Sequence, residues 1–245
     1  MTAGGRADGR VPDAIRTVEI APHFVRTAAG SALMTQGGTR VICTASVSES
    51  VPRWMAGRGT GWVTAEYGML PASTGERKQR DVTRGRPDGR TVEIQRLIGR
   101  SLRGVVDFKA LGERSVYVDC DVLEADGGTR CASITGAYVA LRLALEGLVE
   151  RGEIAASPLT QSIAAVSCGM VSGEPLLDLD YPEDSSAEVD MNVVMTGDGG
   201  LVEVQATAER TPLSRASLDV LLELAAGGIE TLGRAQEAAV VAARR

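Results

Sequence analysis

The chain changes twice from strand-like to helix-like hydrophobic patterning. In the first half, β-branched or alternating runs occupy 17–25, 31–35, 40–47, 61–70 and 114–123. A long apolar helical segment follows at 133–149. In the second half, similar runs occupy 162–171, 175–179, 188–195 and 201–206, and a helical segment at 214–243 closes the chain. Strands followed by a helix in each half predict an α+β fold, not an alternating Rossmann chain.

A short connector at 151–158 separates the two halves, and no long linker or low-complexity tract occurs elsewhere. With 245 residues, of which 44% are hydrophobic, the chain can bury one substantial core. We therefore expect a single unit over 1–245, in which similar halves at 14–150 and 158–245 pack together.

Residue counts exclude several kinds of chemistry. The single histidine, His23, rules out multi-histidine metal sites and leaves little for histidine-based catalysis, and no cysteine has a histidine neighbour. The four cysteines are far apart and lie in or beside apolar runs, so we expect reduced core thiols rather than disulfides or a zinc site. Chemistry is left to carboxylates, hydroxyls, arginines and a bound metal.

No targeting signal is apparent in the sequence. The first ten residues contain no apolar signal core, and no run approaches roughly 18 uninterrupted apolar residues, the length that a membrane span needs. We therefore expect a cytoplasmic protein with no membrane partner.

A basic window occupies 77–103 in a chain of formal net charge −6. Its nine basic and three acidic residues give a local charge of +6. Residues 73–90 predict an exposed loop. Residues 91–108 predict a helix with Arg96, Arg100 and Arg103 on one face. These arginines either pair with acids such as Glu93 or contact the phosphates of RNA or another polyanion. The arginine density of the loop favours the second interpretation.

The tetrapeptide Gly-Gly-Thr-Arg occurs twice, at 37–40 and at 127–130. The first copy precedes a strand and predicts a hairpin turn. The second lies between a strand and a helix, where free backbone N–H groups, glycines, Thr129 and Arg130 would form an orthophosphate cradle. An ordinary strand-to-helix turn is the alternative, and the residues alone leave both open.

An acidic segment runs from Glu174 to Asp190, with seven carboxylates and no basic residue. Alternation along the strand at 188–195 puts Asp190 and Asn192 on one face. Asp184 lies in a turn-like segment that can fold beside that face. The two aspartates would then hold Mg²⁺ or Mn²⁺, or share a proton. The alternative is an acidic surface loop in which Asp184 caps a turn.

Several longer motifs occur in a fixed order from about Arg6 to the closing helix. They lie at 6–10 (RADGR), 41–47 (VICTASV), 61–67 (GWVTAEY), 89–91 (GRT), 93–98 (EIQRLI), 119–123 (DCDVL), 127–130 (GGTR), 183–185 (EDS) and 190–195 (DMNVVM). Together they closely resemble the bacterial ribonuclease PH family. The resemblance implies the RNase PH fold, which is ribosomal protein S5 domain 2-like. It also implies a phosphate-dependent 3′→5′ exoribonuclease, a tRNA nucleotidyltransferase that trims precursor tRNA and other RNA 3′ ends within a hexameric trimer of dimers.

The resemblance also implies roles for particular residues. The phosphate contacts correspond to Arg90, Gly128, Thr129 and Arg130. The catalytic carboxylates correspond to Asp184 and Asp190, which would bind Mg²⁺ or Mn²⁺, with orthophosphate as co-substrate. The basic window would guide RNA through Arg77, Lys78, Arg80, Arg84, Arg86, Arg96 and Arg100.

Three positions depart from the family pattern. Ala72 stands where arginine is common, which bears on one RNA contact, while Cys131 replaces threonine and Arg210 replaces glycine. Two other functions are weighed against the exoribonuclease. One is a non-catalytic RNA-binding subunit of an exosome-like ring, and the other is a metal-dependent hydrolase that uses water as its nucleophile.

Overall fold

The computed structural model describes residues 6–209 and 212–244 and contains two β-sheets. The first sheet has the strand order β1-β2-β3-β5-β4. Its strands are β1 (Val18–Pro22), β2 (Gly30–Gln36), β3 (Thr39–Ser48), β4 (Trp62–Met69) and β5 (Ser115–Glu124). Neighbouring strands are antiparallel except β4 and β5, which are parallel. Every strand segment expected in the first half overlaps one of these strands.

The second sheet is antiparallel throughout and has the order β7-β6-β8-β9. Its strands are β6 (Ile163–Val171), β7 (Glu174–Leu177), β8 (Val189–Thr196) and β9 (Leu201–Ala208). The helices are α1 (Asp81–Arg84), α2 (Gly89–Arg103), α3 (Phe108–Leu111), α4 (Thr129–Glu150), α5 (Tyr181–Ser186) and α6 (Arg215–Ala243).

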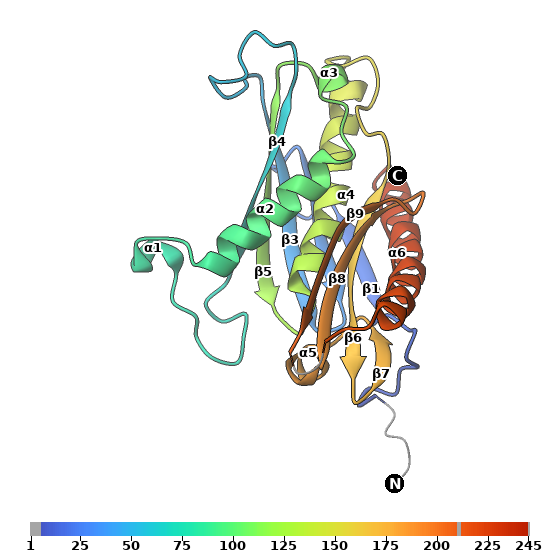
Figure 1. Cartoon of the computed structure of the whole chain (residues 1–245). Coiled ribbons are helices and arrows are strands. Elements are labelled where there is room, and N and C mark those ends of the chain that lie inside the picture. Colours follow the sequence, from blue (N-terminus) through green and yellow to red (C-terminus); the bar gives the residue numbers. More distant parts are fainter. Residues whose placement is uncertain (1–5, 210–211, 245) are drawn as a thin grey trace.

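Helix α4 lies between the two sheets, against β2 and β3 on one side and β6 on the other (Figure 1). Helix α6 covers β6, β7 and β1, and α2 packs on β4. Buried side chains of both sheets and of α4 form one continuous hydrophobic core. The expected α+β fold, with two strand-then-helix halves packed as one unit, is confirmed.

The long apolar helix α4 meets the length and composition of a membrane span, but 78% of its most apolar window is buried inside the molecule. Burial between two sheets explains its apolar surface on all sides. The four cysteines are also buried and free, as expected from their apolar surroundings.

The helix expected at 91–108 has different ends in the structure. Asp88 is the N-cap of α2 and accepts a hydrogen bond of 2.6 Å from the backbone N–H of Thr91. Gly104 follows the last helical residue. Arg90 therefore lies in the first turn of a helix and not in the exposed loop, because an aspartate cap satisfies free N–H groups earlier than the apolar pattern shows.

Two further helix starts differ from the sequence expectation. Helix α4 begins at Thr129, four residues earlier than its apolar pattern, with Gly128 as its N-cap. The segment expected to be a turn forms α5, where Asp180 and Glu183 make a reciprocal capping box. Asp184 thus lies on a short helix whose orientation is fixed at its start.

Candidate active site

Asp184 and Asp190 line one surface pocket of about 490 Å³. Asp184 comes from α5, which lies beside the ends of β8 and β9 (Figure 1), and Asp190 comes from β8. Asp190 pairs in register with Gly169 on β6, and Glu209 also lines the pocket. The structure therefore brings the two predicted carboxylates together.

Burial and mutual repulsion alter the ionisation of this pair. Burial, followed by the negative charge of Asp184, raises the pKa of Asp190 to about 6. The positive charges of Arg130 and Arg90 oppose this rise in pKa. The Asp190 carboxyl therefore retains its proton at higher pH than an isolated aspartate would.

The pair also has the donor set that a divalent cation needs. Mg²⁺ is commonly held by one or two carboxylates together with waters and substrate phosphates. Asp190 Oδ1 is buried and has no hydrogen-bond partner among the described residues. No group of three or more histidine, cysteine, aspartate or glutamate side chains suited to a metal occurs in the described ranges. Asp184 and Asp190 fit Mg²⁺ or Mn²⁺ as a two-carboxylate site.

The raised pKa of Asp190 predicts that the free energy of unfolding depends on pH. Between the ordinary aspartate value of 3.8 and about 6, the folded protein keeps a proton on Asp190 that the unfolded chain has lost. The contribution of Asp190 to the free energy of unfolding therefore falls as pH rises through that interval. We expect Asp190→Asn to exceed wild type in unfolding free energy by about 1–3 kcal/mol at pH 8.

Urea unfolding in EDTA at pH 4 and pH 8 measures this difference. At pH 4 the two proteins should be nearly equal, because Asp190 is protonated in the folded wild type. A stability difference that is the same at both pH values would contradict the assignment.

The second Gly-Gly-Thr-Arg copy forms the turn into α4, as the sequence predicts. Gly127 and Gly128 have φ values of 76° and 65°, in the left-handed region that favours glycine. Among the described residues no side chain caps α4, and its first turn has no acidic residue. Thr129 is buried, and its hydroxyl lies 3.0 Å from the hydroxyl of Tyr67 on β4. Uncapped N–H groups at the start of a 22-residue helix favour a bound anion.

The first Gly-Gly-Thr-Arg copy forms the β2–β3 hairpin, as expected, and also contacts the second copy. The hydroxyl of Thr39 donates a hydrogen bond of 2.7 Å to the carbonyl of Gly127. The same hydroxyl accepts one of 2.9 Å from the backbone N–H of Asp126. The hairpin therefore holds the backbone of the α4 turn, which no local pattern indicated.

Arg130, at the start of α4, and Arg90, at the start of α2, place positive charge near Asp190. Arg130 Nη1 donates to Gln205 Oε1 at 2.8 Å and to Glu93 Oε1 at 3.2 Å. Arg90 is exposed. Both arginines lower the pKa of Tyr67, against the rise that burial causes, as they do for Asp190. The predicted phosphate contacts and carboxylates thus form one region.

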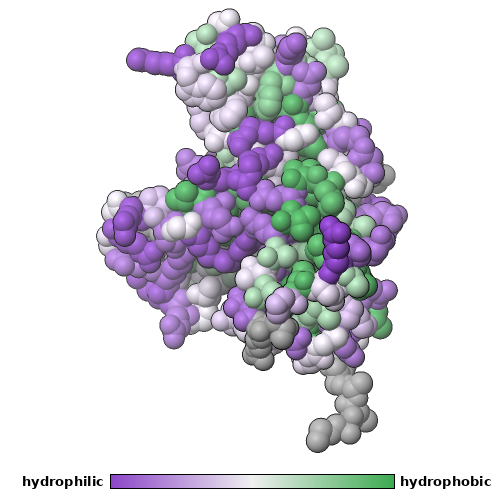
Figure 2. Space-filling view, in the orientation of Figure 1, coloured by the Kyte–Doolittle hydropathy of each residue, from purple (hydrophilic) through white to green (hydrophobic). Residues whose placement is uncertain are grey.

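The loop before α2 carries exposed positive charge. Figure 2 shows hydrophilic side chains gathered around α1 and α2. Lys78 and Arg84 lie near one carboxylate, at 3.2 Å and 3.5 Å from Asp88 Oδ2. The exposed arginines of the loop are Arg77, Arg80, Arg84 and Arg86. This surface provides phosphate-binding groups, and its contact with RNA stays a prediction.

The ion pairs of α2 differ from those weighed at the sequence level. Glu93 contacts Arg130, whereas Arg100 makes a bidentate pair with Glu203 on β9 at 2.6 Å and 3.0 Å. Arg96 is exposed and forms no ion pair with the part of the chain that the structure describes. Sequence spacing suggested partners on the same helix, but strand β9 provides the partner of Arg100.

The three departures from the family pattern have different positions. Ala72 is exposed beside the basic loop. Cys131 is buried in the first turn of α4, where its thiol lies 3.2 Å from Asn192 Oδ1 and burial raises its pKa. Arg210 lies outside the described residues.

The family follows from two matches that cover most of the chain. Residues 14–145 match domain 1 of the 3′ exoribonuclease family, and residues 161–228 match domain 2. The chain therefore belongs to the RNase PH family of 3′ exoribonucleases. Membership of the bacterial branch stays a prediction.

Solved structures share the fold. An exosome from Archaeoglobus fulgidus with RNA bound to the active site matches at TM-score 0.79 and 23% identity, over 94% of this chain and 92% of that one. Rrp46 from rice (Oryza sativa) matches at TM-score 0.77 and 18% identity, over 96% of this chain and 100% of that one. An archaeal exosome core matches at TM-score 0.75 and 23% identity, over 95% of this chain and 91% of that one.

Proposed function

We propose that this protein is a phosphorolytic 3′→5′ exoribonuclease that trims the 3′ end of precursor tRNA. The observation that carries the proposal is the uncapped start of α4 beside Arg130, whose positive charge opposes the rise in the pKa of Asp190. A site for inorganic phosphate beside a carboxylate pair suits transfer of a nucleotide to phosphate. Membership of the 3′ exoribonuclease family supports the same chemistry.

Orthophosphate is the nucleophile in this mechanism. Backbone N–H groups of the α4 turn, the Thr129 hydroxyl and the Arg90 and Arg130 guanidinium groups would hold and orient it. A phosphate oxygen attacks the phosphorus of the last phosphodiester, and the bond to the preceding 3′ oxygen breaks. The products are a nucleoside diphosphate and an RNA that is one nucleotide shorter. Positioning and charge stabilisation provide most of the catalysis.

The carboxylate pair would assist departure of the 3′ oxygen. Asp184 would donate a proton to the departing 3′ oxygen as a general acid. Asp184 and Asp190 would hold Mg²⁺ or Mn²⁺, and the bound ion supplies positive charge that stabilises the transferring phosphoryl group.

RNA would reach this site across the basic surface. Backbone contacts to phosphates carry little sequence information, so we expect weak sequence preference. Exosome assemblies are among the similar structures, and we propose a homohexameric trimer of dimers acting in the cytoplasm. The proposed RNA contacts are Arg77, Lys78, Arg80, Arg84, Arg86, Arg96 and Arg100.

One assay distinguishes this function from its alternatives. Purified protein is incubated with Mg²⁺ and 3′-extended tRNA, with and without orthophosphate, and the released nucleotides are separated by chromatography. We expect nucleoside diphosphates that appear only when orthophosphate is present.

The other outcomes identify the competing functions. Nucleoside monophosphates in both conditions would indicate hydrolysis by water. RNA binding without any released nucleotide would indicate a non-catalytic ring subunit, which is the second candidate because exosome proteins are among the similar structures.

A further inference from the structure

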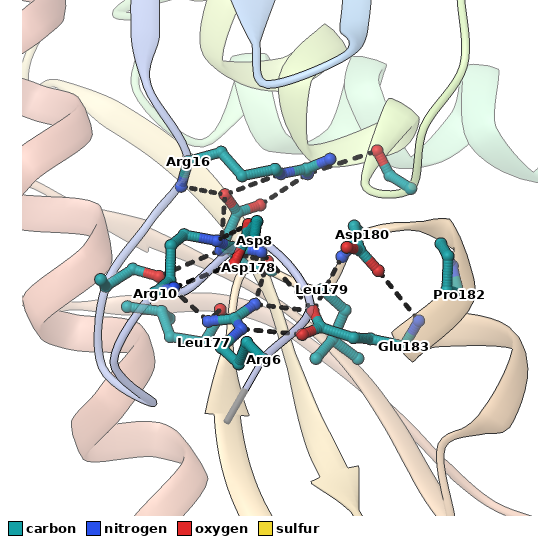
Figure 3. A network of polar contacts seen from close by, with 12 residues as sticks. Arg6, Asp8, Arg10, Arg16, Leu177, Asp178, Leu179, Asp180, Pro182 and Glu183 are labelled. Atoms are coloured by element: carbon teal, nitrogen blue, oxygen red, sulfur yellow. Dashed lines mark hydrogen bonds and ion pairs between the residues drawn. The ribbon is translucent and has the colours of Figure 1, made fainter. Parts of the chain in front are cut away.

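Residues 6–16 precede the first strand but pack on the second half of the molecule, beside β7 and α5 (Figure 3). The guanidinium groups of Arg6, Arg10 and Arg16 point toward Asp178 and Glu183. Arg6 is 9% exposed and Arg16 is 6% exposed. Arginines are rarely buried this deeply without partners, so these contacts fix the path of the segment. We call residues 6–16 the N-terminal clamp.

One arm of the clamp holds α5. Arg6 binds Glu183 in bidentate fashion, with Nε and Nη2 at 2.8 Å and 2.7 Å from the two carboxylate oxygens. Glu183 directly precedes Asp184 and also accepts a hydrogen bond of 3.1 Å from the Asp180 backbone N–H in the capping box. Arg6 further donates to the carbonyl of Leu177 at 2.8 Å. The Arg6 fork therefore joins the end of β7 to the first turn of α5.

The other arm holds the turn into α4. Arg16 Nε and Nη2 donate to the two carboxylate oxygens of Asp178 at 3.0 Å and 2.7 Å. The same guanidinium group donates to the carbonyls of Asp126 and Gly127. Asp178 is 1% exposed and has a φ of 53°, a conformation uncommon for residues other than glycine. The ion pair therefore stabilises both an unusual backbone and the neighbouring turn.

The two arms meet where the halves of the molecule touch. A Cβ atom on Gly127 would lie 2.5 Å from the carbonyl oxygen of Leu179 and 3.0 Å from the backbone nitrogen of Tyr181. Arg10 bridges the arms, since its Nη1 donates to the Asp178 carbonyl at 2.9 Å and its Nη2 lies 3.6 Å from Glu183 Oε2. A shift of either arm would therefore move the α4 turn relative to α5.

We propose that the N-terminal clamp is a positioning element with two separable roles. Arg16 and Asp178 fix the phosphate-binding turn, and Arg6 and Glu183 fix α5 so that Asp184 faces Asp190. The inference rests on the proposed function. The clamp residues are positioning residues, because they hold the backbone that carries the reacting groups and belong to neither the cradle nor the carboxylate pair.

Lysine substitutions test the two arms, because lysine keeps the charge and loses the planar fork. Arg16→Lys should raise the KM for orthophosphate about tenfold and change kcat much less. Arg6→Lys should lower kcat about 10²-fold and leave that KM within about twofold. Rates are divided by the folded fraction, measured by circular dichroism. Glu183→Gln keeps an acceptor for Arg6 and replaces Arg6→Lys if the latter does not fold.

Arg142→Lys is the matched control. Arg142 lies on α4 about 20 Å along the helix from the turn. It pairs with Glu146 at 2.9 Å and with Glu237 on α6. We expect this variant to lose stability and to keep both kinetic constants. Similar changes in KM and kcat for all three lysine variants, or no change in Arg6→Lys and Arg16→Lys, would overturn the proposal.

Binding measurements separate failure of the clamp from failure of the proposed function. With orthophosphate present, Mn²⁺ binding followed by electron paramagnetic resonance should weaken about tenfold in Glu183→Gln, because Asp184 is displaced. It should be unchanged in Arg142→Lys. If wild type binds Mn²⁺ and orthophosphate without degrading RNA, the proposed function fails, and these binding constants alone decide the role of the clamp. Unchanged Mn²⁺ binding in Glu183→Gln would overturn the α5 arm.

Discussion

Asp184→Asn should lower kcat about 10³-fold, which corresponds to about 4 kcal/mol of transition-state stabilisation. The amide has nearly the shape of the carboxyl but cannot donate a proton to the departing 3′ oxygen. It also removes one of the two carboxylates of the pair. Orthophosphate and RNA binding should stay close to wild type, since the α4 turn and the basic loop are unchanged. Single-turnover release of nucleoside diphosphate measures this loss without interference from product release.

Asp198→Asn is the matched control for this substitution. Asp198 is an exposed aspartate in the β8–β9 turn, where it binds the Thr196 hydroxyl. It should retain wild-type turnover. An Asp184→Asn enzyme with normal kcat would remove Asp184 from the mechanism, and a parallel loss of RNA binding would assign it to substrate recognition.

Arg130→Ala should raise the KM for orthophosphate about 10²-fold. The side chain donates charge-assisted hydrogen bonds to an anion, and losing such bonds costs about 1.5–3 kcal/mol. RNA affinity should change little, because the guanidinium group lies at the α4 turn, where it contacts Gln205 and Glu93. Initial rates over a range of phosphate concentrations, with RNA binding measured separately by filter retention, give both quantities.

Arg100→Ala provides the reciprocal comparison. Arg100 lies on α2 and is paired with Glu203, so its removal should leave the phosphate KM unchanged and weaken RNA binding modestly. Equal losses of phosphate and RNA binding in Arg130→Ala would argue against a dedicated phosphate site. They would favour a general electrostatic surface instead.

Local patterns account for much of the architecture. The strands follow from alternation and β-branched runs, since a strand buries every second residue wherever it pairs. The two Gly-Gly-Thr-Arg copies differ in the element after each of them, and the structure has the predicted hairpin at the first and the predicted helix start at the second. Asp184 and Asp190 line one pocket, as the carboxylate-pair interpretation requires, although the Asp184 segment forms α5 where a turn is expected.

The ion-pair partners of charged side chains cannot be predicted from the same local patterns. Spacing along one helix makes Glu93 a candidate partner of Arg96 and Arg100, but it contacts Arg130 instead. Arg6 and Glu183 are separated by 177 positions in the chain. Hydrophobic periodicity states which face of an element is buried, but it contains no information about which distant charge will lie against that face.

The amino-acid sequence by itself determined the fold class, the family resemblance and the residue types available for chemistry, because these depend on local periodicity, on motif order and on counts. Only the tertiary structure decided that Thr39 supports the α4 turn, that burial and Asp184 raise the pKa of Asp190, and that the N-terminal clamp joins the turn to α5. The physical reason is that desolvation and ion pairing depend on distances between segments, which are set when both sheets pack around α4.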